Sequence, residues 1–161
     1  MALMKQIAQH FRQVHFGGNW TDVNLKDSLA DLSWQEAITQ LPTLNTIAQL
    51  VFHSNYYVSA VLKRLQGEPL NASDKFSFDL SPITSAEDWQ KLVKKVLEEA
   101  ELFAHQVEKM DEAKLLEDFA GSQYGNYYRN LLGIIEHTHY HLGQIVLIKK
   151  IIRQSKNSTL K

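Results

Sequence analysis

The segment from Asn126 to Arg153 constrains the fold more than any other part of the chain, because it contains no proline and is far longer than a typical strand. Its three closely spaced histidines alternate with other residues, and that spacing of two would also suit a strand. Isoleucines and two of the histidines instead recur at intervals of three and four, which is typical of a buried helix face. These positions are Ile134, His137, His141, Ile145, Ile148 and Ile152. We therefore predict one long helix.

On such a helix, His137 and His141 lie one turn apart on the same face, about 6 Å along the axis. Their imidazoles can then close on a single metal ion. His139 points the other way, and we expect it on the outer face with a role toward solvent or at an interface. The pair alone does not establish a site, since histidines at this spacing also occur on helices that bind no metal.

The chain has no cysteine among its 161 residues, which excludes a disulfide framework, a thiolate metal site and a cysteine nucleophile. Any metal must therefore be held by nitrogen and oxygen. With 44% hydrophobic residues the chain can bury a substantial core, and we expect a single domain over residues 1–161.

The net charge is −1 and no basic block occurs, so we expect neither a nucleic-acid partner nor an anionic membrane. No run of eighteen apolar residues is present, and the N-terminus lacks a signal-peptide pattern. We therefore expect a cytoplasmic protein.

The rest of the sequence predicts helices throughout, so the expected fold class is all-α: a four-helix bundle with short accessory helices. The segment 71–84 is polar and aromatic and contains Pro82, and we expect it to form a packed surface loop. We also expect a loop over the stretch with Trp20 and Leu25. The polar tail 154–161 is expected to be frayed. The predicted helices run from Leu3 to the Gly17–Gly18 pair, from the Ser33 capping box to Pro42, from Thr43 to Gln66, onward from Ser85, from Asp111 to about Ala120, and over 126–153.

His53 is the best candidate for a third ligand, because it lies in the middle of the predicted helix 43–66 among apolar and aromatic neighbours. Taken alone, a histidine in that position is more often a hydrogen-bonded core residue. Its occurrence together with the His137/His141 pair in a cysteine-free chain favours the metal site. The remaining histidines are less well placed, since two lie near the end of the first helix and one lies among charged residues: His10, His15 and His105.

A di-iron site is the alternative suggested by Glu136 and His139, which form one Glu-x-x-His motif. Such a site needs a second copy of the motif, and the chain has none. Placing Glu136 and His139 inside would also turn His137 and His141 away from the core. We therefore reject the di-iron interpretation.

A histidine in the second long helix, followed by a helix bearing His137-Thr138-His139-Tyr140-His141-Leu142-Gly143-Gln144-Ile145-Val146, resembles the DinB-like superfamily, which includes bacillithiol-transferase-like enzymes. The resemblance extends over nearly the whole chain, including Trp20 and the loop with Ser77-Phe78-Asp79. It implies an up-down-down-up four-helix bundle, often a homodimer, that holds one divalent ion, nickel or zinc. The implied metal ligands are His53, His137 and His141.

The resemblance also implies an enzyme that acts on a small-molecule substrate, and together with a competing non-enzymatic interpretation this leaves three functions between which the sequence does not decide. The leading one is a thiol S-transferase, which uses a low-molecular-weight thiol as co-substrate. A metal-dependent hydrolase acting at the same site is the second, and a non-enzymatic dimeric bundle stabilised by metal, with a binding or stress-response role, is the third. The apolar stripe of the third long helix offers no fourth ligand, which favours an open site. Gln144 and Tyr57 are candidates for groups beside the ligands, although packing explains them equally well.

Overall fold

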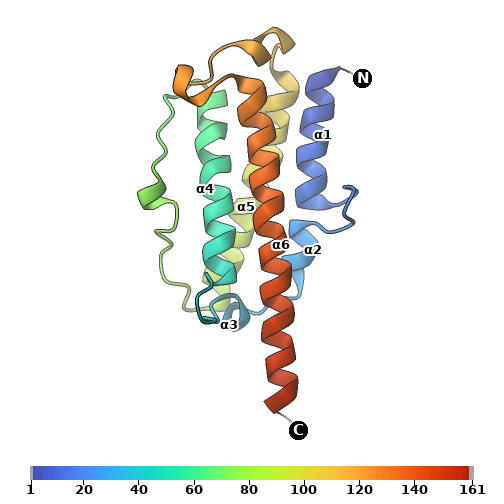
Figure 1. The fold of residues 1–161 in the computed structure, drawn as a ribbon, viewed down its shortest axis with the longest axis vertical. Coiled ribbons are helices and arrows are strands. Elements are labelled where there is room, and N and C mark those ends of the chain that lie inside the picture. The colour runs from blue at the N-terminus through green and yellow to red at the C-terminus, as the bar shows by residue number, and fades with distance from the viewer. Residues whose placement is uncertain (1, 160–161) are drawn as a thin grey trace.

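The computed structural model describes residues 2–159, and within that range it contains helices and no strand, which confirms the predicted all-α class (Figure 1). Three short 3-10 helices lie in the connections: η1 (Asp74–Phe76), η2 (Glu112–Leu116) and η3 (Ser122–Tyr124). The α-helices are α1 (Leu3–Phe16), α2 (Leu25–Ala30), α3 (Trp34–Ala37), α4 (Ile47–Leu65), α5 (Ala86–Lys109) and α6 (Tyr127–Thr159).

Helix starts follow the capping signals in the sequence. The Ser33 hydroxyl accepts a hydrogen bond from the Glu36 amide, and the Glu36 side chain accepts one from the Ser33 amide, so the predicted capping box is present at α3. A second capping box at α4 joins Thr46 to Gln49. That helix therefore begins at Ile47, a few residues after the predicted start at Thr43. At the other end of α1, Gly17 adopts a φ of 111°, which only glycine takes up readily, and this ends the helix as predicted.

Three predicted boundaries were wrong. The stretch expected to be a loop around Leu25 contains α2, whose first turn is capped by the Asn24 side chain. The segment after Asp111 forms a 3-10 helix that ends at Leu116 and does not reach Ala120. The helix predicted over 126–153 continues into the polar tail as far as Thr159, because no glycine or proline stops α6 there. Residues 160–161 of that tail lie outside the described residues.

The core lies among the long helices, since α1 packs against α5 and α6, and α4 packs against the same two helices. The aromatic centre of this core is the pair Phe11 and Phe103, whose ring centroids lie 4.3 Å apart. Both side chains are fully buried. The contact between α4 and α6 matters most for function, because it brings together the two helices that carry the candidate ligands.

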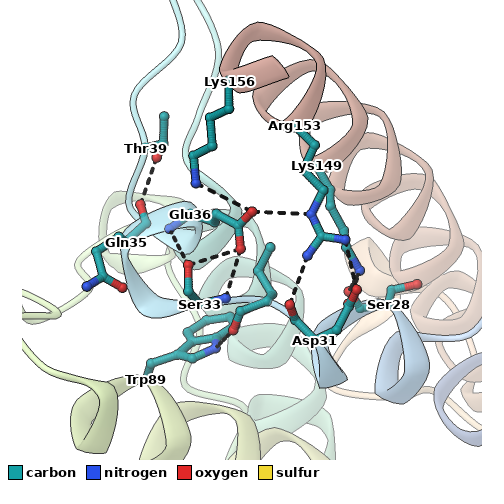
Figure 2. A network of polar contacts seen from close by, with 11 residues as sticks. Ser28, Asp31, Ser33, Gln35, Glu36, Thr39, Trp89, Lys149, Arg153 and Lys156 are labelled. Carbon is teal, nitrogen blue, oxygen red and sulfur yellow. Dashed lines mark hydrogen bonds and ion pairs between the residues drawn. The ribbon is translucent and has the colours of Figure 1, made fainter. Parts of the chain in front are cut away.

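The C-terminal half of α6 is fixed by ion pairs to the short helices (Figure 2). Arg153 donates to Asp31 at 2.8 Å and to Glu36 at 3.2 Å, and Lys149 donates to Asp31 and to the Ser28 carbonyl. Hydrogen bonds from Lys149 and Arg153 lower the pKa of Asp31 to about 2, so the pairs persist at neutral pH. We refer to these contacts of Lys149 and Arg153 as the α6 clamp.

α6 is 33 residues long, yet polar residues recur along it. Neither α6 nor any other helix within residues 2–159 is apolar enough over a sufficient length to cross a membrane.

Replacing Phe103 by alanine should lower the free energy of unfolding by about 3–5 kcal/mol, because it removes a buried ring and leaves a cavity beside Phe11. Chemical denaturation followed by circular dichroism measures this change. The matched control is Leu102→Ala, since Leu102 is half exposed and its truncation should change the stability by no more than about 0.5 kcal/mol. Equal losses for the two variants would contradict the core assignment.

Candidate metal centre

Three imidazoles meet between α4 and α6. The Nε2 atom of His137 lies 3.1 Å from the Nε2 atom of His53 and 3.1 Å from that of His141. Ligand atoms of all three side chains lie within 4.8 Å of one another. The structure thus brings together the three histidines that the sequence analysis selected, and these residues could hold a metal ion.

The positions of these side chains follow from helix geometry. His53 lies in the middle of α4, and His137 and His141 lie one turn apart on α6, so their rings project from one face toward α4. His53 is 9% exposed and His141 is 7% exposed, whereas His137 is half-buried. Because α4 and α6 pack directly against each other, the rings are brought into contact, and each of the three imidazoles comes from one of these two helices.

Hydrogen bonds fix the protonation of two rings. The Nδ1 atom of His53 lies 3.3 Å from the Ser77 carbonyl, and the Nδ1 atom of His141 lies 2.7 Å from the Gln144 side-chain oxygen. Both partner oxygens are acceptors as placed, which favours the tautomer that carries the proton on Nδ1 in each of these two rings. The Nε2 atoms of His53 and His141 therefore present lone pairs to the same point, and this is how histidines that bind metal are usually oriented.

The geometry and the chemistry of these donors fit a divalent ion. An ion about 2.0–2.1 Å from two nitrogens at a tetrahedral angle would separate them by about 3.3 Å, close to the observed spacing. Burial lowers the pKa of all three histidines, and electrostatic repulsion from neighbouring rings lowers the pKa of His53 and His137 further. The pKa of His137 falls to about 4, so the rings are neutral at pH 7 and can donate their lone pairs. His137 Nδ1 is buried and has no hydrogen-bond partner in the described part of the chain, so the orientation of this ring rests on packing.

The other histidines lie elsewhere. His139 was predicted to face outward, but its Nε2 atom is buried and its ring lies 6.4 Å from that of His10, because α1 covers this side of α6. His15 is fully buried and bonds the Phe11 carbonyl, and burial lowers its pKa to about 4. His105 is exposed on α5, as expected. Glu136 is also exposed, which agrees with rejecting the di-iron site.

A cavity of about 690 Å³ opens beside the three imidazoles. His53 and His137 line it, together with residues of α4, the loop before α5, the segment before α6 and the first turns of α6. No carboxylate joins the histidine group among residues 2–159. An ion bound here would keep coordination positions for water or a substrate, as catalytic sites do.

Sequence reasoning missed what the loop before α5 supplies. The Phe78 ring stacks on His53 with centroids 4.0 Å apart, and the Ser77 carbonyl orients the same imidazole. Tyr57, which the sequence did suggest, packs edge-on against both His53 and His137, and its hydroxyl donates to Asp74. The aromatic composition of the loop was the one signal that it packs on the site. Nothing in the sequence indicated which backbone carbonyl would meet His53.

The three-histidine site should bind about one divalent ion per chain. Protein purified without a polyhistidine tag should contain nickel or zinc, or take it up, and elemental analysis measures the content. His53→Ala and His141→Ala should lose the metal, because each removes one of only three ligands. His139→Ala and His105→Ala should keep it, since neither side chain reaches the site. Wild-type protein that stays metal-free with added nickel or zinc would refute the site.

Gln144 should strengthen metal binding by fixing the tautomer of His141. Replacing Gln144 by leucine removes the acceptor and should weaken metal affinity by about 10–100-fold, measured by competition with a chelating dye. Gln144→Glu retains an acceptor oxygen and should preserve most of the affinity. A leucine variant that binds as tightly as wild type would show that Gln144 only packs.

Comparison with known proteins assigns neither a family nor a function to this chain. No protein-family model, no curated protein and no solved structure matches the chain. The functional argument therefore rests on the three imidazoles, the groups that orient them and the cavity beside them.

Proposed function

We propose that this chain is a divalent-metal-dependent enzyme of the DinB-like superfamily that transfers a low-molecular-weight thiol to an electrophilic small molecule. The observation that carries the proposal is the convergence of three Nε2 atoms next to an open cavity. A metal-stabilised structural bundle would need no such cavity and would close its coordination sphere with protein ligands.

The fold is consistent with this family. We infer that α1, α4, α5 and α6 form an up-down-down-up four-helix bundle. In support, each of these helices packs against two of the others, and in Figure 1 the chain descends in α1 and α6 but ascends in α4 and α5. The candidate ligands then belong to the second and fourth helices of the bundle.

The imidazoles of His53, His137 and His141 would hold nickel or zinc, which would supply Lewis acidity and so lower the pKa of a thiol or water in the cavity. In thiol transfer, the thiol gives up its proton to solvent and its sulfur forms a bond to an electrophilic carbon. The leaving group departs with the electron pair of the bond that breaks. The chain itself therefore needs no cysteine, and it has none.

The protein residues orient the ligands and shield the reactants. Ser77 and Gln144 hold the imidazoles of His53 and His141. Apolar side chains predominate around the cavity, which suits an organic electrophile better than water: Ala60, Val61, Leu70, Phe78, Phe119 and Ile134. Burial and the hydrogen bond to Asp74 raise the pKa of Tyr57, so its hydroxyl stays protonated beside the site.

Metal-loaded protein should accelerate the conjugation of a small thiol such as cysteine to chlorodinitrobenzene, with release of chloride, and mass spectrometry identifies the thioether. His141→Ala and metal-free protein should lose at least about tenfold in rate, because the Lewis acid is absent. The control His105→Ala should match wild type. If the rate does not depend on metal, the transferase proposal fails. Metal-dependent hydrolysis of a nitrophenyl ester without any thiol would support the hydrolase instead.

A further inference from the structure

One row of residues on α6 connects the metal ligands to a cation. Arg129, Gly133 and His137 follow one another at intervals of four, and all three line the cavity. Residues at this spacing share a helix face, and eight residues of helix place the backbone of Arg129 about 12 Å from that of His137. The cavity therefore has the candidate metal centre at one end of this row and a guanidinium at the other.

Gly133 leaves space between those two ends. A Cβ atom built on it would meet no heavy atom within 4 Å, so packing does not require glycine here. Glycine inside a helix costs about 1 kcal/mol relative to alanine. The absent side chain widens the cavity next to His137, where a ligand would have to lie in order to reach both ends.

Arg129 is the one arginine whose side chain has no partner among the residues that the structure describes. Of the four arginines, Arg12 bonds Glu101 and Glu108, Arg64 bonds the Phe119 carbonyl and Arg153 belongs to the α6 clamp. Within residues 2–159 the Arg129 guanidinium forms neither a hydrogen bond nor an ion pair, although its backbone amide bonds Asn126. A guanidinium presents paired N–H donors that match a carboxylate or phosphate.

The charge of the cavity also favours a ligand with a carboxylate or phosphate group. The one carboxylate among its lining residues, Asp74, already accepts a hydrogen bond from Tyr57. Three neutral imidazoles contribute no negative charge, so a cavity with a bound divalent ion would be net positive. A positive, partly enclosed space attracts anions.

We propose that the substrate has an apolar body and an anionic group, a carboxylate or a phosphate, and that Arg129 pairs with that group while the reactive end lies at the imidazoles. This rests on the proposed function, because it assigns the class of substrate to the same site. Gly133 provides the room that the body of the substrate occupies.

The test uses zinc-loaded full-length protein and two probes, mercaptohexanoate and the neutral mercaptohexanol, with affinities from calorimetry. Wild type should bind the acid about fivefold more tightly than the alcohol, as expected for one partly exposed ion pair. Arg129→Met should abolish this preference and leave the affinity for the alcohol unchanged, and Arg129→Lys should restore part of it. Equal binding of the two probes to wild type, or a preference that survives in Arg129→Met, would overturn the proposal.

A second pair of variants tests the space at Gly133. Gly133→Leu should weaken both probes while the zinc content stays at the wild-type level, because its side chain enters the cavity. Gly143→Leu is the matched control: it is also a helical glycine with no heavy atom within 4 Å of a built Cβ, but it does not line the cavity. Undiminished probe binding by zinc-loaded Gly133→Leu would show that the substrate does not lie there.

The two proposals fail in different ways. Zinc binding without any preference for the acid would overturn the role of Arg129 and leave the metal-dependent function standing. If zinc does not bind, the proposed function fails, and hexanoate and hexanol then replace the thiol probes on metal-free protein. A preference for hexanoate that disappears in Arg129→Met would still support the anion site, and equal binding would overturn it.

Discussion

The packing of α4 against α6 is the interaction on which the candidate site depends. His53 comes from one helix and His137 and His141 from the other, so a rotation of either helix would separate the nitrogen atoms. The buried residues of α1 and α5 support this contact from the opposite side, with Phe11 and Phe103 at the centre of the core. The apolar core therefore does two things at once, since it stabilises the fold and fixes the distance between the imidazoles.

Much of the fold could be predicted because its signals are local. The Ser33 capping box lies within four residues, and the stripe through Ile134, Ile145 and Ile152 is a regular pattern within a single helix. α2 was missed because six residues are too few to show a period, and only the Asn24 cap marks its start. The continuation of α6 beyond Arg153 was missed because a polar composition was taken as a sign of fraying, whereas polar residues without glycine or proline can extend a helix.

The candidate site was predictable to the extent that it lies on helices. The spacing of His137 and His141 placed them on one face, and the apolar surroundings of His53 indicated that it faces inward. The contributions of Ser77 and Phe78 could not be predicted, because a backbone carbonyl has no sequence signature and a loop has no period. The partial burial of His139 could not be predicted for a related reason, since it depends on where α1 lies and not on α6 itself.

The continuity of α6 limits how the chain can change in length. The two candidate ligands on α6, His137 and His141, and the α6 clamp belong to one uninterrupted helix, with His141 and Lys149 eight residues apart. Inserting or deleting one residue between them would turn the ligands by about 100° relative to the clamp, so both sets of contacts could not be kept. A change of seven residues would nearly restore the orientation, because it amounts to about two turns. Chains that share this architecture should therefore vary in length in the loop between α4 and α5 and hold the length of α6 constant between its ligands and its clamp.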